Sequence, residues 1–199
     1  MKPFEDVKRQ ILESAEKRFS DFGFNKTTLA EIAHDCKMSQ ANIYRYFKNK
    51  LDIAAFLTEW YFEHSHNRLR AIVRESGPGA SQKLERFVVD YLRFNHTEVA
   101  KRSRIFDMVE YICRERRDII EKNIATERAL IAEILSEGNR NGEFNVKDVV
   151  ATSGYIQSAT LAFNALPFFL TFTRIGDYPL AEMEESARGV VRTLIKGLK

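Results

Sequence analysis

Residues 27–50 have the sequence TTLAEIAHDCKMSQANIYRYFKNK, which contains two short helical segments joined by a tight turn. The first segment begins at Thr28, because Thr28 and Glu31 have the spacing of a capping box. The second begins at Ser39, a favourable N-cap residue. Each segment has one apolar face, formed by Leu29, Ile32, Ala33, Met38, Ile43 and Phe47. Helices this short are unstable alone, so the pattern predicts a helix-turn-helix packed on a larger helical platform.

The platform is predicted on both sides of this pair. A helix over 5–22 precedes it and ends at Gly23, which suits the position just after a helix. Its apolar residues recur at helical spacing: Val7, Ile11, Ala15 and Phe19. A helix over 49–75 follows, with Asp52 supporting its first turn. Together these segments predict a three-helix DNA-binding domain over 1–50, with the 49–75 helix as its connection to the rest of the chain.

The remaining residues, 51–199, are predicted to form a larger helical domain. The Gly/Pro/Ser-rich stretch 76–81 is the clearest break. Further helices are predicted over 82–101, 103–114, 117–137, 146–172 and 180–198, with a bend at Pro167 in the fourth. No segment alternates between apolar and polar residues as a strand does. The fold class is therefore all-α, with about nine helices.

Composition indicates a soluble globular protein, and its charge distribution is compatible with polyanion binding or with chance. With 44% hydrophobic and 30% charged residues, the chain has the balance of a globular protein and not of a disordered one. No apolar run is long enough to span a bilayer, and two cysteines suggest no disulfide framework, so we expect a cytoplasmic protein without membrane contact. Residues 1–50 hold ten of the 31 Lys/Arg and seven of the 28 Asp/Glu, so the whole net charge of +3 lies there. A localised basic segment is typical of polyanion binding.

The spacing of these residues resembles the DNA-binding signature of the TetR family. The matching runs are Thr28-Leu29-Ala30-Glu31-Ile32-Ala33 and Met38-Ser39-Gln40-Ala41-Asn42-Ile43-Tyr44-Arg45-Tyr46-Phe47-Lys48-Asn49-Lys50. The resemblance covers residues 5–65. Two positions depart from it: Lys37 replaces the usual turn glycine, and Ala41 replaces a glycine of the recognition helix. Ala41 adds a methyl group where the family approaches DNA closely, which affects operator preference and not the fold.

The resemblance and side-chain chemistry together indicate which residues contact DNA. Gln40 and Asn42 have amides that suit adenine edges, and Ala41 offers a methyl group for thymine. Lys50, Tyr44 and Tyr46 are expected at phosphates, with Arg45 at a phosphate or a guanine. The full predicted set is Thr27, Thr28, Ser39, Gln40, Ala41, Asn42, Tyr44, Arg45, Tyr46, Lys48 and Lys50.

The C-terminal helices are rich in aromatic residues, which indicates either ordinary core packing or an apolar ligand cavity. An uncharged polar stripe at Ser153, Gln157, Thr160 and Asn164 suits an interior that hydrogen-bonds a ligand, although a mildly polar outer face is an equal alternative. The predicted ligand-binding residues are Phe87, Tyr91, Phe106, Tyr111, Tyr155, Gln157, Thr160, Phe163, Asn164 and Phe168.

A dimer interface is predicted on the same helix and on the last one. In TetR-like proteins the last two helices form a four-helix interface, and small side chains permit close helix approach. The predicted interface residues are Ala151, Gly154, Ser158, Ala162, Ala165, Val191, Leu194 and Ile195.

No catalytic, metal or cofactor motif is found. His64 and His66, like His34 and Cys36, are two residues apart and do not share a helix face. A charge cluster at 114–118 is expected to be a solvated face, with an anion site as the minor alternative. We therefore predict a homodimeric transcriptional regulator and not an enzyme. The resemblance implies a repressor that leaves a palindromic operator when a small, largely apolar ligand binds. A dimeric DNA-binding protein without ligand control and a helical small-molecule carrier are the alternatives.

Overall fold

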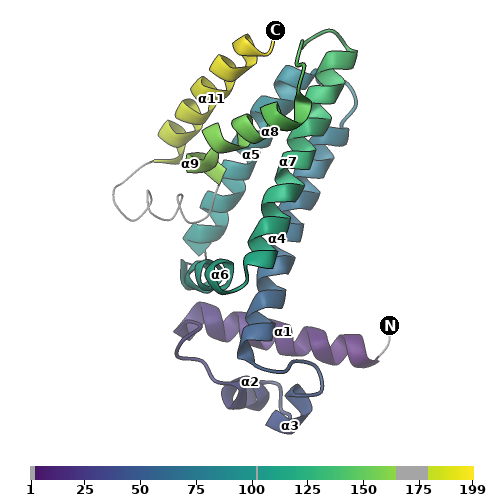
Figure 1. Ribbon diagram of the computed structural model, residues 1–199. Coiled ribbons are helices and arrows are strands. Elements are labelled where there is room, and N and C mark those ends of the chain that lie inside the picture. The colour runs from purple at the N-terminus through teal and green to yellow at the C-terminus, as the bar shows by residue number, and fades with distance from the viewer. Residues whose placement is uncertain (1–2, 102, 165–178) are drawn as a thin grey trace. The chain divides into compact units, whose positions relative to one another are not determined.

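The computed structural model describes residues 3–101, 103–164 and 179–199 (Figure 1). All regular structure in these residues is helical, which confirms the all-α prediction. The ten helices are α1 (Pro3–Phe22), α2 (Leu29–Asp35), α3 (Gln40–Ile43), α4 (Lys50–Arg74), α5 (Ala80–Lys101), α6 (Ser103–Glu115), α7 (Arg117–Arg140), α8 (Val149–Ala159), α9 (Leu161–Asn164) and α11 (Leu180–Gly197). Gly23, with φ of +86°, ends α1 as predicted.

The prediction of one helix over 146–172 is wrong. The helix α8 ends at Ala159, and α9 begins again at Leu161. Between them Thr160 has φ of −104° and ψ of 4°, and its hydroxyl donates to the Ile156 carbonyl at 2.9 Å. A threonine hydroxyl that bonds to the preceding turn competes with the helical backbone pattern. The predicted bend at Pro167 lies outside the described residues.

The chain divides into two compact units. The N-terminal unit consists of residues 1–62 and 99–120, and the C-terminal unit consists of residues 63–98 and 121–199. The chain therefore passes between the units within the helices α4, α5 and α7. The N-terminal unit also includes α6, which packs against α1.

The N-terminal unit has a compact apolar core. Core side chains without exposed surface come from α1 to α4 and from α6, and they include Ile11, Phe19, Ile32, Ile43, Ile53 and Ile112. The helix α6 covers this core with aromatic rings. Tyr111 lies against Phe24, with ring centroids 5.4 Å apart, and Phe106 meets Tyr61 edge-on at 5.2 Å. The short helices α2 and α3 thus stand on the helical platform that the sequence predicts.

The C-terminal unit packs α5, α7, α8, α11 and the second half of α4 around its own core. The core includes Leu84, Val88, Leu92, Ile134, Leu135, Ile156 and Val191. Ion pairs hold α11 against α5: Arg93 donates to Glu184 at 2.6 Å, and Arg188 donates to Glu85 at 2.7 Å. Between α7 and α8, the Asn139 side chain exchanges two hydrogen bonds with the backbone of Val146, which fixes the predicted turn.

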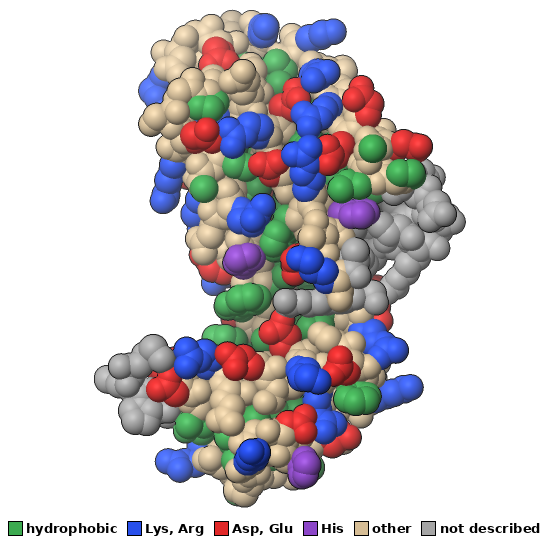
Figure 2. All heavy atoms as spheres, turned by 180° about the vertical axis from the view of Figure 1, so that it is seen from behind, with side chains coloured by type: hydrophobic (Ala, Val, Ile, Leu, Met, Phe, Trp, Pro, Cys, Tyr) green, Lys and Arg blue, Asp and Glu red, His purple; other side chains and the backbone are tan. Residues whose placement is uncertain are grey.

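The surface of both units carries charges of either sign, without a large patch of one sign on the face that Figure 2 shows. This mixture matches the near balance of acidic and basic residues in the sequence. Among the described helices, none has a stretch apolar and long enough to cross a bilayer.

Candidate nucleic-acid interface

The helix α2 begins with a complete capping box, as predicted. The Thr28 hydroxyl accepts from the Glu31 backbone N–H at 3.3 Å, and the Glu31 carboxylate accepts from the Thr28 backbone N–H at 2.8 Å. The Thr28 N–H and hydroxyl both donate to the Glu31 carboxylate, at 2.8 Å each, and these two hydrogen bonds lower the pKa of the carboxyl because its charged form accepts them. Arg18 of α1 adds hydrogen bonds to Asp35 at the other end of α2. The helix is therefore fixed at both ends.

The turn between α2 and α3 requires a left-handed residue, and Lys37 supplies it with φ of +54°. A non-glycine residue pays about 1–2 kcal/mol for this conformation. The turn closes with hydrogen bonds from the Lys37 N–H to the His34 carbonyl and from the Met38 N–H to the Ala33 carbonyl, each at 3.0 Å. The departure from the family pattern at Lys37 is thus accommodated without a change of fold.

The helix α3 presents the predicted recognition residues to solvent. Ser39 caps it by accepting from the Asn42 N–H at 3.2 Å, while Ile43 and Phe47 are buried beneath it. The predicted DNA-contacting residues with exposed side chains are Thr28, Ser39, Gln40, Ala41, Tyr44, Arg45 and Lys48. The Gln40 amide lies 3.4 Å from the Tyr44 hydroxyl, so these two side chains support each other on the exposed face.

Lys50 has a different environment from the one predicted. Its ammonium donates to the carbonyls of Phe24 and Thr27 at 2.7 Å each and lies 4.3 Å from the centre of the Phe24 ring. Burial lowers the pKa of this ammonium. Lys50 therefore fixes the loop between α1 and α2, and a phosphate contact would use the third N–H of its ammonium.

Two other predicted DNA-contacting residues do not present free polar groups. The prediction for Thr27 is wrong, because its side chain is 1% exposed and its hydroxyl donates to the Gly23 carbonyl at 3.0 Å. The Asn42 amide is half-buried and contacts the Met38 sulfur at 3.7 Å. Tyr46 is half-buried as well. These roles could not be distinguished from the sequence, because burial depends on how the α1–α2 loop packs.

The exposed residues together have the chemistry of a duplex-binding surface. The amide of Gln40 matches the paired donor and acceptor of an adenine edge, and Arg45 matches a guanine edge or a phosphate. The Tyr44 hydroxyl and the Lys48 ammonium suit phosphate oxygens. The side chains of Thr28 and Ser39 cap α2 and α3, so these residues lie on or directly after capped helices.

The predicted ligand-binding residues do not form one group. Phe87 and Tyr91 are buried in the C-terminal unit, as are Gln157 and Thr160, and Phe163 is half-buried. Phe106 and Tyr111 pack in the N-terminal unit instead. The prediction for Tyr155 is wrong for an interior site, since this side chain is 71% exposed. The Asn164 side chain and Phe168 lie outside the described part of the chain.

The polar stripe of α8 is buried where it is described, which excludes the alternative of a polar outer face. The hydroxyls of Ser153 and Thr160 bond to carbonyls of their own helix. Gln157 instead reaches α7: its amide N–H donates to the Ile124 carbonyl at 3.0 Å and to the Glu127 carboxylate at 3.2 Å, and its oxygen accepts from Arg128 at 3.2 Å. Glu127 was not predicted as a site residue.

The predicted dimer residues fall into two classes. The first class is accessible to a partner chain. On α8 and α9, Ser158 is exposed and Ala151, Gly154 and Ala162 are half-buried. On α11, Leu194 is half-buried as well. The prediction for Val191 and Ile195 is wrong, since both are buried within a single chain at α11. Ala165 lies outside the described residues. The exposed apolar residues Val150 and Tyr155 on α8 were not predicted for the dimer interface, although they are next to the small-residue positions.

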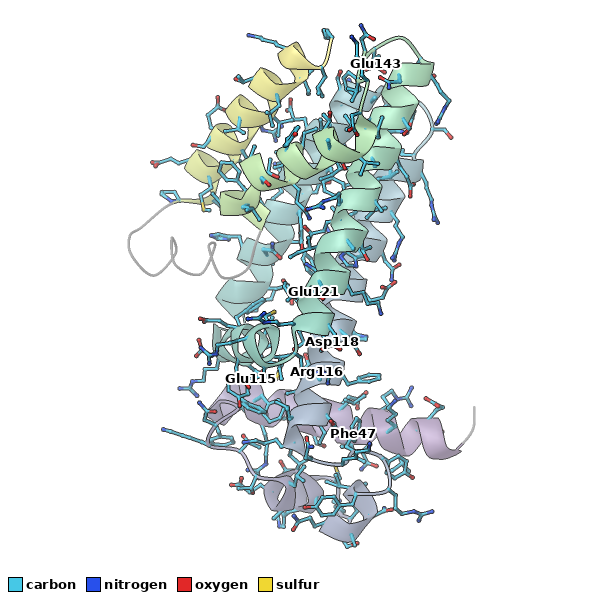
Figure 3. All side chains as sticks on the ribbon, viewed as in Figure 1. Phe47, Glu115, Arg116, Asp118, Glu121 and Glu143 are labelled. Carbon is cyan, nitrogen blue, oxygen red and sulfur yellow. The ribbon has the colours of Figure 1, made fainter. Side chains whose placement is uncertain are left out.

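The charge cluster between α6 and α7 is paired within itself. Arg116 donates to both carboxylate oxygens of Asp118, at 2.9 and 2.7 Å, and Arg114 lies 3.8 Å from Glu115. Figure 3 shows Glu115, Arg116 and Asp118 together at this junction. A self-paired, exposed cluster is a solvated face, so the anion-site alternative has no support. Within the described ranges, no three His, Cys, Asp or Glu side chains gather as metal ligands.

Comparison with known proteins agrees with this geometry. The sequence profile described as "Bacterial regulatory proteins, tetR family" matches residues 11–55, and the profile "Tetracyclin repressor-like, C-terminal domain" matches residues 80–192. The "Probable HTH-type transcriptional regulator YttP" of Bacillus subtilis is 27% identical over 139 residues, which cover 69% of this chain and 67% of that protein.

Two crystal structures show the same fold. A transcriptional regulator of the TetR/AcrR family from Thermobifida fusca has a TM-score of 0.68 at 20% identity, with 98% of this chain and 99% of that chain covered. The regulator FadR from Bacillus subtilis in complex with stearoyl-CoA has a TM-score of 0.68 at 19% identity, with 96% and 99% covered. At these identities the likeness concerns the fold alone.

Proposed function

The chain belongs to the TetR family of DNA-binding transcriptional regulators, and from this premise we propose that it is a homodimeric repressor that binds a palindromic operator and leaves it when a small, largely apolar molecule binds. The observation that carries the proposal is the exposed surface formed by α3 and the turn that follows it, where Gln40, Tyr44, Arg45 and Lys48 reach solvent and the Ser39 side chain caps the helix. Two copies related by a two-fold axis would place two such helices in successive major grooves.

The DNA-binding part is tested with the purified full-length protein and a pool of random duplexes. Repeated selection should enrich an inverted repeat whose half-sites are about ten base pairs apart, centre to centre. The enriched duplex then serves as the operator in gel-shift titrations. Gln40→Ala should relax sequence preference, because it removes an amide suited to a base edge, while Tyr44→Phe should lower affinity for every sequence alike.

A matched pair of lysine variants measures phosphate contact. Lys48→Ala should weaken operator binding and reduce the slope of log affinity against log salt by about 2 in a dimer, since each protomer loses about one phosphate contact. Lys147→Ala, an exposed lysine in the loop before α8, should change neither quantity. A protein that stays monomeric, or that selects no sequence from the pool, contradicts the proposal.

Release by a ligand requires a difference in ligand affinity between the DNA-bound and free conformations. Operator affinity then falls by the ratio of those two affinities and no further. The C-terminal unit supports this part, because it buries polar groups such as Gln157 and Glu127 that a ligand could contact. Operator binding that no bound small molecule changes would identify a dimeric DNA-binding protein without ligand control.

A further inference from the structure

The turn between α2 and α3 (Figure 1) contains a lysine in a conformation that favours glycine. Lys37 has φ of +54°, and the other described residues with positive φ are glycines, namely Gly23, Gly77 and Gly142. A side chain in this left-handed region destabilises the folded state, because its Cβ crowds the following carbonyl oxygen. The two hydrogen bonds that close the turn use backbone N–H groups, so a glycine at position 37 would form them as well.

The ammonium of Lys37 has no partner within the described part of the chain. The side chain is exposed and takes part in none of the ion pairs, hydrogen bonds or ring contacts of those residues. The neighbouring acids are occupied, because Asp35 accepts from the Arg18 guanidinium at 2.5 and 3.0 Å. Glu31 accepts from the Thr28 N–H at 2.8 Å and lies 3.3 Å from Arg18. The charge of Lys37 therefore remains available to a molecule outside the chain.

Two further cations beside α3 share this property. Arg45 and Lys48 are exposed, and no ion pair of the described residues includes either of them. They follow α3 in the sequence, whereas Lys37 lies two residues before Ser39, the N-cap of that helix. A recognition helix enters the major groove, and phosphates line both edges of the groove. Unpaired cations before and after the helix match this distribution of negative charge.

We propose that Lys37 is a further DNA-contacting residue and that its ammonium binds a backbone phosphate at the edge of the groove that α3 enters. This inference rests on the proposed operator binding. A lysine suits the role, because its flexible four-carbon stem carries a compact charge away from the turn. A phosphate contact holds no sequence information, so Lys37 contributes to affinity and not to the choice of operator. The residue therefore has two opposing effects: it lowers stability and raises DNA affinity.

The variant Lys37→Gly measures both effects in the full-length protein. Glycine relieves the left-handed strain by more than the flexibility it adds to the unfolded chain, so the melting midpoint should rise by about 2 °C. Affinity for the duplex enriched from the random pool should fall about tenfold at about 0.15 M salt. The slope of log affinity against log salt should decrease by about 2, since the dimer loses two phosphate contacts. An unrelated duplex of equal length should lose affinity by a similar factor.

Two variants control for charge and for strain. Lys37→Arg keeps the charge and the left-handed conformation, so operator affinity should stay within about twofold. Gly142→Lys places a lysine in another left-handed turn, where φ is +72° and an added Cβ has no neighbour within 4 Å. It should lower the midpoint by about 2 °C. Operator affinity and salt slope should not change, because Gly142 belongs to the C-terminal unit and not to the recognition surface.

Unchanged operator affinity and salt slope in Lys37→Gly would overturn the inference. A loss of affinity together with a lower midpoint would overturn it as well, because damage to the turn would then explain the loss, and so would an equal loss in Lys37→Arg. In each of these cases the unsubstituted protein still binds its operator, and only the role of Lys37 is refuted. If the unsubstituted protein enriches no duplex from the pool, the proposed DNA-binding function fails, and the inference fails with it.

Discussion

The two units obtain their polar contacts in different ways. Among the polar side-chain contacts described above for the N-terminal unit, only those of Arg18 and Lys50 reach more than four residues along the chain. The side chains that cap α2, α3 and α4 bond to groups three residues away. The pairs are Thr28 with Glu31, Ser39 with Asn42, and Asn49 with Asp52. Such contacts follow from local sequence, because the chain brings the two partners together as soon as the helix turns.

In the C-terminal unit the important polar contacts join residues far apart in the sequence. The pairs are Tyr91 with Glu127, Lys83 with Glu137, Ala80 with Glu143, and Arg93 with Glu184. These contacts exist only after the helices have packed. The comparison predicts that substitutions in the C-terminal unit have the larger effects on stability, wherever the contact is buried.

The largest effect is expected at Lys83, which is buried and whose ammonium donates to both Glu137 carboxylate oxygens at 2.8 Å and to the Val73 carbonyl at 2.9 Å. Lys83→Met removes the charge at similar length and leaves Glu137 without its cation. The free energy of unfolding should fall by about 3 kcal/mol. Denaturant unfolding followed by circular dichroism at fixed protein concentration measures it.

The control for this experiment is another ion pair of the same unit that reaches solvent. Arg93 pairs with Glu184 at 2.6 Å, but the arginine side chain is half exposed. Arg93→Met should therefore cost less than about 1 kcal/mol. Equal losses from Lys83→Met and Arg93→Met would mean that burial does not decide the strength of these long-range pairs.

A smaller effect is expected from acid, through His66. Its pKa is about 4 in the folded protein and about 6.5 in an unfolded chain, so between these values the unfolded state binds the proton and the folded state does not. Stability should therefore fall as the pH is lowered through this window, by about 2 kcal/mol from pH 7 to pH 5 for this group.

The His66→Gln variant isolates this contribution, because the raised pKa of Glu127 acts in the opposite direction and is present in both proteins. The other charges that act on His66 are Arg70, Glu63 and Lys122, which the variant retains. Unfolding curves at the two pH values should show a smaller loss in His66→Gln than in the unsubstituted protein. Identical losses would place the acid sensitivity elsewhere.

The same comparison explains which features could be predicted from the sequence. The caps, the end of α1 at Gly23 and the positions of α2 and α3 follow from residues a few positions apart. The burial of Thr27 and the internal bonds of Lys50 could not be predicted, because both depend on the path of the α1–α2 loop. Thr27 and Lys50 were predicted to contact DNA only because they occupy the corresponding positions of the family signature.

In the C-terminal unit most helices were predictable, but the break at Thr160 and the polar partners were not. Asn123 and Glu127 are four residues apart, a spacing that looks like an ordinary exposed face of α7. Their burial follows from packing with α4, α5 and α8, which no local pattern encodes. For the same reason Val191 looked available for a partner chain, although it is buried inside its own unit.

The smallest effect is expected at the Thr28 cap. Thr28→Ala removes the hydroxyl that accepts from Glu31 and should destabilise the N-terminal unit by about 1 kcal/mol, whereas Thr28→Ser keeps the hydroxyl and should cost a few tenths. Denaturant unfolding followed by circular dichroism measures both variants, and the fluorescence of Trp60, the single tryptophan, gives a second reading from a residue of this unit. An alanine variant as stable as the serine variant would mean that packing, and not the cap, holds α2. Local capping would then not distinguish the N-terminal unit from the C-terminal unit.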